Sequence, residues 1–240
     1  MLHFYYLWLH NPKDHLVESP EILIKRYYEI IPRSFSTKLE LFLFSKCHYE
    51  RNIGNITWSE FKWFTITDDL VKVYLKAWTL DYEERLSKEG LTMQEIDDMI
   101  KVWPKDNTSL QAELLEQYRL NFITVLFPFS NFEKIFDPDP EKRICHYCHI
   151  SDKEIELLEA RGQIKTKRDR GYTMEIDRIK PNYEYFKDNV VLACYWCNNA
   201  KSDEFTSKEF SNHIGPGIGK VWEERISEQS IKINQVQIKI

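Results

Sequence analysis

Four of the five cysteines form two CxxC pairs, Cys145/Cys148 and Cys194/Cys197. A short CxxC segment lets two sulfurs reach one ion, and two such pairs supply the four thiolates of a tetrahedral structural zinc site. A redox dithiol needs only one CxxC in a thioredoxin-like βαβ setting, and disulfides are disfavoured in a reducing compartment. The pairs therefore predict one zinc ion with no open coordination position, and the remaining Cys47 is expected to be buried.

Three segments follow one another around these cysteines: CHYC at 145–148, MEIDRIKP at 174–181 and DNVVLACYWCNNAKSD at 188–203. In this order and spacing they resemble the HNH endonucleases, the ββα-metal group, in the subclass with a four-cysteine zinc site. The resemblance extends over about a quarter of the chain. It carries an Asp-Arg variant of the motif, because Arg178 stands where a general-base histidine is usual.

The resemblance implies roles for five side chains. In that family the residue closing the first strand and a final Asn or His on the helix bind a divalent metal, and a central Asn braces the loop. Asp177 and Asn198 are therefore expected to bind Mg²⁺ or Mn²⁺, and Asn189 is expected to brace. Carboxylate and amide oxygens are hard ligands that suit these ions. Lys201, about one helical turn after Asn198, is expected to add charge against a phosphate.

Arg178 cannot be the base, since a guanidinium stays protonated at neutral pH. Its planar fork of donors can instead clamp the scissile phosphate and stabilise developing charge. The base would then be a metal-bound water or a histidine from elsewhere. His146, His149 and His213 are the candidates, and the sequence does not choose among them.

The elements that must position these residues predict an α+β protein. A mainly α-helical N-terminal domain of unknown role is expected over 1–138, followed by a zinc-stapled ββα-metal (HNH) domain over 139–228. The alternating tail 229–240 is expected to be an edge strand or disordered. Helical periodicity runs through the first half, with Pro32, Pro104 and Pro128 expected to interrupt it.

The second half carries shorter signals. Ser151 and Glu154 form a capping box for a helix through Ala160, with Gly162 ending it. The segments YTMEID and NVVLAC are short and rich in β-branched and aromatic residues, which predicts a β-hairpin with a broad connection. A further helix is expected near Asn198, and TSKE at 206–209 is expected to cap another.

Composition limits the partners. The formal net charge of −5 does not suggest a protein that coats nucleic acid through electrostatics alone. Residues 161–180, however, hold seven basic and three acidic residues, a local patch able to meet phosphates. No apolar run reaches the roughly 18 residues of a membrane helix, and a signal peptide is not expected. A cytoplasmic protein without membrane contact is therefore predicted.

The leading hypothesis is a metal-dependent endonuclease that hydrolyses phosphodiester bonds in DNA, with RNA not excluded. By family analogy it would serve in prokaryotic anti-phage defence or restriction, with a protein partner such as an ATPase bound through the helical half. The alternative is a zinc-stabilised module that binds nucleic acid or another protein without cleavage.

Overall fold

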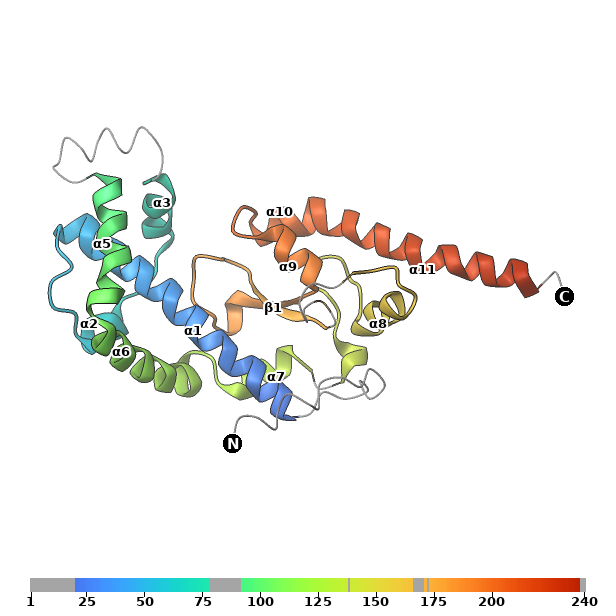
Figure 1. Ribbon diagram of the computed structural model, residues 1–240, viewed down its shortest axis with the longest axis horizontal. Coiled ribbons are helices and arrows are strands. Elements are labelled where there is room, and N and C mark those ends of the chain that lie inside the picture. Colours follow the sequence, from blue (N-terminus) through green and yellow to red (C-terminus); the bar gives the residue numbers. More distant parts are fainter. Residues whose placement is uncertain (1–19, 78–91, 138, 166–170, 172, 238–240) are drawn as a thin grey trace. The chain divides into compact units, whose positions relative to one another are not determined.

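The computed structural model describes residues 20–77, 92–137, 139–165, 171 and 173–237 (Figure 1). Its elements are α1 (Pro20–Ser45), η2 (Lys46–Glu50), α2 (Trp58–Trp63), α3 (Asp68–Lys76), α5 (Met93–Asp106), α6 (Thr108–Asn121), η3 (Phe122–Leu126), α7 (Phe129–Ile135), η4 (Pro140–Lys142), α8 (Asp152–Ala160), β1 (Glu175–Arg178), η5 (Lys187–Asn189), β2 (Val190–Ala193), α9 (Tyr195–Lys201), α10 (Ser207–Glu209), η6 (Phe210–Ile214) and α11 (Gly215–Gln237). The protein is mostly helical with a small antiparallel sheet, which confirms the predicted α+β class.

The described residues pack as two compact units that interleave along the sequence, and the ranges below refer to those residues alone. The first, here called the sheet unit, comprises Met1–Arg26, Ser130–Ile179 and Val190–Ile240. The second, here called the helical unit, comprises Tyr27–Phe129 and Lys180–Asn189. The consecutive domain limits expected from the sequence remain a prediction. Among the described residues, none of the helices has the length and hydrophobicity of a transmembrane span.

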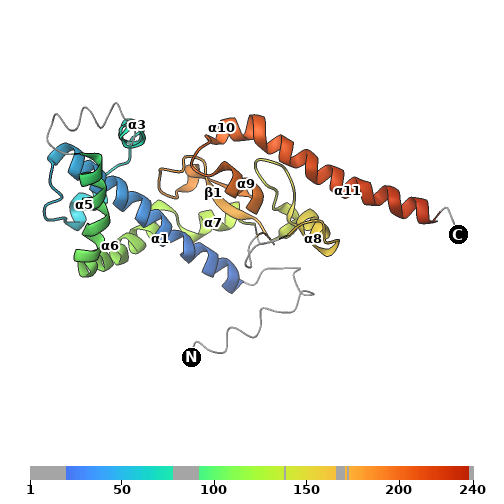
Figure 2. The ribbon, with the colours of Figure 1, turned by 45° about the horizontal axis from the view of Figure 1, so that its top comes forward.

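The helical unit is held together by buried aromatic rings. Phe61 of α2 is fully buried. Its ring centroid lies 5.5 Å from Phe35 and Phe42 of α1 and 6.2 Å from Tyr118 of α6. Such tilted and edge-on pairs add to the free energy of burying large apolar side chains. Figures 1 and 2 accordingly show α2, α5 and α6 gathered around the C-terminal part of α1.

The connection between the two strands belongs to this helical unit. The Tyr185 N–H donates to the Ser34 hydroxyl at 3.0 Å, and the Tyr118 hydroxyl donates to the Glu184 carboxylate at 2.9 Å. The Lys38 ammonium lies 3.5 Å from the same carboxylate. Burial raises the pKa of Glu184, and the Lys38 ammonium opposes that shift. The loop that joins β1 to β2 is therefore fixed by buried polar contacts.

Two of the three expected helix breaks are wrong. Pro32 lies inside α1 and Pro104 inside α5, although a proline in a helix interior costs about 3 kcal/mol. In α1 the neighbouring Ile30, Ile31 and Phe35 are buried, so tertiary packing offsets that cost. Pro128 does separate η3 from α7, as predicted.

The local signals of the second half are confirmed. Ser151 and Glu154 form the capping box of α8, and Gly162 follows that helix with φ +66°. β1 and β2 pair antiparallel, with Asp177 opposite Val191 and Arg178 opposite Val190. Helix α9 begins at Tyr195, three residues before the expected start, because Cys194 accepts the N–H of Cys197 as its N-cap. The TSKE segment caps α10.

The edge strand expected over 229–240 is wrong for the residues up to Gln237, which are helical. Helix α11 runs through that residue, and 238–240 lie outside the described chain. No glycine or proline follows Gly219 in this helix, so nothing in the sequence stops it, and extending a formed helix is favourable compared with nucleating one.

Candidate metal centre and active site

The four cysteines of the CxxC pairs form one buried cluster. The sulfurs of Cys145, Cys148, Cys194 and Cys197 all lie within 4.8 Å of one another, and those of Cys148 and Cys194 are 3.6 Å apart. In a tetrahedral zinc site, Zn–S bonds of about 2.3 Å place the sulfurs about 3.8 Å apart. The cluster therefore fits a structural zinc site with no position left for a substrate. Cys47 lies buried outside it, as expected.

Backbone hydrogen bonds shape the first pair. The Cys145 N–H donates to the Ile150 carbonyl at 2.9 Å, and the Cys145 carbonyl accepts the His149 N–H at 3.0 Å. His149 takes a left-handed conformation with φ +61°, which closes the turn. The His146 N–H donates to the Leu192 carbonyl of β2 at 2.8 Å. The first pair is thus tied directly to the sheet.

The N-terminal turn of α11 packs against the same pair through two glycines. A Cβ at Gly215 would lie 2.5 Å from the Tyr147 carbonyl oxygen, and a Cβ at Gly219 would lie 2.7 Å from the Cys148 carbonyl oxygen. Both distances are shorter than real Cβ contacts, so only glycine allows this approach. At Gly217 a Cβ would meet nothing within 4 Å.

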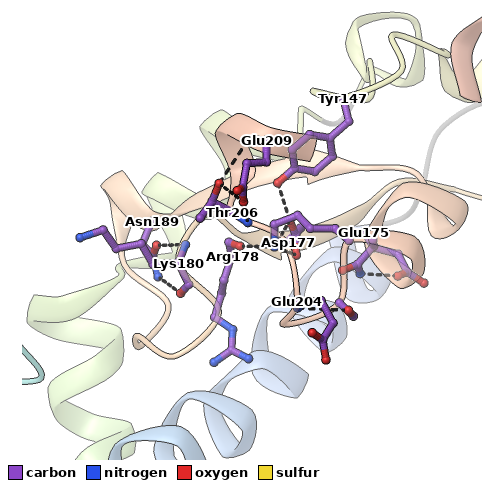
Figure 3. A network of polar contacts seen from close by, with 12 residues as sticks. Tyr147, Glu175, Asp177, Arg178, Lys180, Asn189, Glu204, Thr206 and Glu209 are labelled. Carbon is purple, nitrogen blue, oxygen red and sulfur yellow. Dashed lines mark hydrogen bonds and ion pairs between the residues drawn. The ribbon is translucent and has the colours of Figure 1, made fainter. Parts of the chain in front are cut away.

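Asp177 lies near the end of β1 and is almost completely buried. Its carboxylate accepts the Tyr147 hydroxyl at 2.6 Å (Figure 3). It also lies 3.2 Å from the Lys201 ammonium. Burial raises the pKa of Asp177, while Lys201 and the Tyr147 hydroxyl oppose the shift. Burial and the neighbouring carboxylate also raise the pKa of Tyr147. The carboxylate therefore has a charge partner from α9 and a hydrogen-bond partner from the turn of the first CxxC pair.

Lys201 lies at the C-terminal end of α9, one helical turn after Asn198, as expected from the sequence. Its side chain is fully buried in α9. Besides meeting Asp177, its ammonium donates to the Arg178 carbonyl at 2.9 Å. Both bonds reach β1, so Lys201 joins helix to sheet. A fully buried ammonium held this way is not placed to contact an incoming phosphate, and the charge-supplying role expected from the sequence has no support in this geometry.

Asn198 lies one helical turn before Lys201, so the two share one face of α9. Its amide nitrogen donates to the Glu175 carboxylate at 2.7 Å. Glu175 precedes Asp177 by two residues on β1, and residues two apart in a strand project to the same side. The structure thus places Glu175, Asp177 and Asn198 at the junction of β1 and α9, where Glu175 bonds Asn198 and Asp177 pairs with Lys201. Glu175 was not predicted from the sequence as a site residue, because a single acidic residue in a strand matches no functional motif by itself.

The Asn189 side chain makes hydrogen bonds within the loop that joins β1 to β2, in the helical unit. Its amide oxygen accepts the Lys180 N–H at 2.8 Å, and its amide nitrogen donates to the carbonyls of Lys180 and Glu184 at 3.2 and 2.8 Å. A side chain that bonds both ends of a loop fixes its conformation. This geometry is compatible with the expected bracing role, which stays a prediction.

Arg178 is half-buried, and Figure 3 shows its side chain extending away from the Asp177 carboxylate. The three candidate histidines are all exposed. Within the described residues no hydrogen bond connects His146, His149 or His213 to Asp177. The geometry therefore selects none of them as a general base.

Comparison with protein-family models and with curated proteins gave no significant match. Among solved structures, the chain is similar to one described as "An extraordinary mechanism of DNA perturbation exhibited by the rare-cutting HNH restriction endonuclease PacI". The match has 29% identity and a TM-score of 0.35, and covers 41% of this chain and 66% of that chain. So low a TM-score establishes no common fold between the two chains.

Proposed function

We propose that this chain is a metal-dependent, HNH-like endonuclease that hydrolyses phosphodiester bonds in DNA. The observation that carries the proposal is the junction of β1 and α9. There Asp177 and Asn198, the two expected ligands, lie on elements joined by the Lys201–Asp177 ion pair and the Asn198–Glu175 hydrogen bond. The four-cysteine cluster sits at the N-terminus of that same helix, which fixes its position relative to the sheet.

The donor set fits a hard divalent ion. One carboxylate oxygen of Asp177 and the amide oxygen of Asn198 would hold Mg²⁺ or Mn²⁺, which prefer oxygen ligands. When bound, such an ion supplies charge stabilisation for a phosphate oxygen and for the leaving oxygen. Arg178 would orient the scissile phosphate with its fork of donors, and Asn189 would hold the strand connection in one conformation.

The HNH resemblance supports DNA as the substrate, with RNA as the polymer to test beside it because the bond is of the same kind. It also supports a role in restriction or in defence against phage. These finer assignments rest on the resemblance alone.

A second candidate function is favoured by one specific contact. The Lys201 ammonium already neutralises Asp177, as a metal ion would. In a zinc-stabilised module that binds nucleic acid without cutting it, Lys201 would replace the divalent ion permanently. Such a module would bind DNA without requiring Mg²⁺, and added Mg²⁺ would change its affinity only as a competing counterion.

Plasmid nicking separates the two candidates. The zinc-loaded protein should nick supercoiled plasmid in Mg²⁺ or Mn²⁺ and stop when EDTA is added. Because prolonged chelation would also remove structural zinc, the decisive step is rescue: after brief chelation that leaves the zinc bound, excess Mg²⁺ without added zinc should restore cleavage. DNA binding with no nicking in any divalent ion would favour the non-cleaving module.

A further inference from the structure

Glu175 makes a contact that no expected role explains. Its carboxylate accepts the Asn198 amide N–H at 2.7 Å, across the junction between β1 and α9. Figure 3 shows Glu175 to the right of Asp177, which it precedes by two residues on β1. The separation is that of a charge-assisted hydrogen bond, which is shorter and stronger than one between neutral groups.

This bond fixes which way the Asn198 amide points. An ionised carboxylate only accepts hydrogen bonds, whereas an asparagine amide has a donating nitrogen and an accepting oxygen. Glu175 therefore holds the nitrogen of Asn198, and the amide oxygen is directed to the other side. A free asparagine could turn its amide by half a revolution and offer the nitrogen, which binds no metal.

We propose that Glu175 is a positioning residue, which holds the Asn198 amide oxygen available for the divalent ion. This inference rests on the proposed function, since it assumes that Asn198 is a ligand. Residues that orient metal ligands through a hydrogen bond typically change metal affinity by about 10- to 100-fold when replaced. Glu175 is expected to act within that range.

The test is Mn²⁺ binding to the full-length, zinc-loaded chain, measured by electron paramagnetic resonance in the absence of nucleic acid. Glu175→Ala should weaken Mn²⁺ binding about 10- to 100-fold. Zinc content and melting temperature should stay close to wild type. Glu223→Ala removes an exposed carboxylate from α11 and should leave Mn²⁺ affinity unchanged, which controls for the loss of one negative charge.

A double-mutant cycle distinguishes positioning from direct ligation. If Glu175 acts only through Asn198, Glu175→Ala should cause no further loss in an Asn198→Ala background. If both residues touch the ion, their losses should add. Additive losses would overturn the positioning role.

A second test uses one substitution in two backgrounds, where it should change Mn²⁺ affinity in opposite directions. In the wild-type background Glu175→Gln should weaken Mn²⁺ binding, because a glutamine amide can bond Asn198 in either orientation. In an Asn198→Asp background the same Glu175→Gln change should strengthen it, because the amide donates to the new carboxylate and a repulsive pair is removed. A merely structural residue would not reverse sign.

The outcomes separate this inference from the proposed function. If the wild-type protein binds no Mn²⁺, both the proposed metal site and the role of Glu175 are wrong. If the wild type binds Mn²⁺ and Glu175→Ala binds it equally well, only the role of Glu175 is wrong.

Discussion

The Lys201 ammonium lies 3.2 Å from the Asp177 carboxylate, and both side chains are almost completely shielded from water. Removing one partner of a buried ion pair leaves the other charge uncompensated, at a cost of about 3–5 kcal/mol. Lys201→Met should therefore lower the free energy of unfolding by about that amount, as measured by urea denaturation. Adding Asp177→Asn should recover most of the loss, since the neutral amide still accepts the Tyr147 hydroxyl.

Lys208→Met is the matched control for this pair. Lys208 is exposed on α10, and surface substitutions usually change stability by no more than about 0.5 kcal/mol. A Lys201→Met protein as stable as Lys208→Met would show that the ion pair is not formed in solution.

The four-cysteine cluster predicts one zinc per chain. Because structural zinc binding contributes folding free energy, Cys194→Ser should lose the metal and unfold the sheet unit. The measurement is elemental analysis together with thermal denaturation. Cys47→Ala removes the cysteine outside the cluster and should keep one zinc per chain, whatever its effect on packing. Equal zinc content in the two variants would exclude the cluster as the binding site.

The packing of α11 against the first cysteine pair gives a third prediction. Gly219→Ala would place a Cβ 2.7 Å from the Cys148 carbonyl oxygen, and overpacking of this kind typically costs about 1–3 kcal/mol. Gly217→Ala lies in the same helical turn, in open space, and should be neutral or stabilising because alanine favours helix by up to about 1 kcal/mol. Thermal denaturation of the two variants measures the difference. Equal melting temperatures would mean that α11 does not pack on the cysteine pair.

The sequence predicted those parts of the protein that local pattern encodes. The CxxC spacing, the Ser151 capping box and the hairpin are each fixed by a few neighbouring residues, and the structure has all three. Pro32 and Pro104 were misread because buried neighbours decide whether a helix tolerates a proline. That information is not local.

The contacts that the site residues make could not be predicted from the sequence either. Lys201 was expected to meet phosphate, but in the folded protein its buried ammonium pairs with Asp177 of β1. Glu175 was not singled out, because its contact with Asn198 depends on how a helix packs on a strand 23 residues away. The position of a residue in a motif can suggest its role. Which charged side chains pair across elements depends on the three-dimensional fold.

Arg178 supports the fourth prediction. If it clamps the scissile phosphate, Arg178→Ala should lower the cleavage rate about 10²–10³-fold, the usual effect of removing one transition-state donor. Arg178→Lys should recover only part, because an ammonium cannot replace a bidentate guanidinium. Single-turnover cleavage at saturating Mg²⁺ measures both. Full activity in Arg178→Ala would contradict the clamp.

Single-turnover cleavage of duplex DNA by Asn198→Ala and Asn199→Ala tests the central claim most directly. The two asparagines are neighbours on α9, but Asn198 faces Glu175 on β1, whereas Asn199 is exposed and bonds the Tyr195 carbonyl within its own helix. Both variants should keep zinc and fold. The account predicts that Asn198→Ala loses Mg²⁺-dependent cleavage while Asn199→Ala cuts at close to the wild-type rate. Cleavage by Asn198→Ala at the rate of Asn199→Ala would contradict the assignment of this junction as the active site.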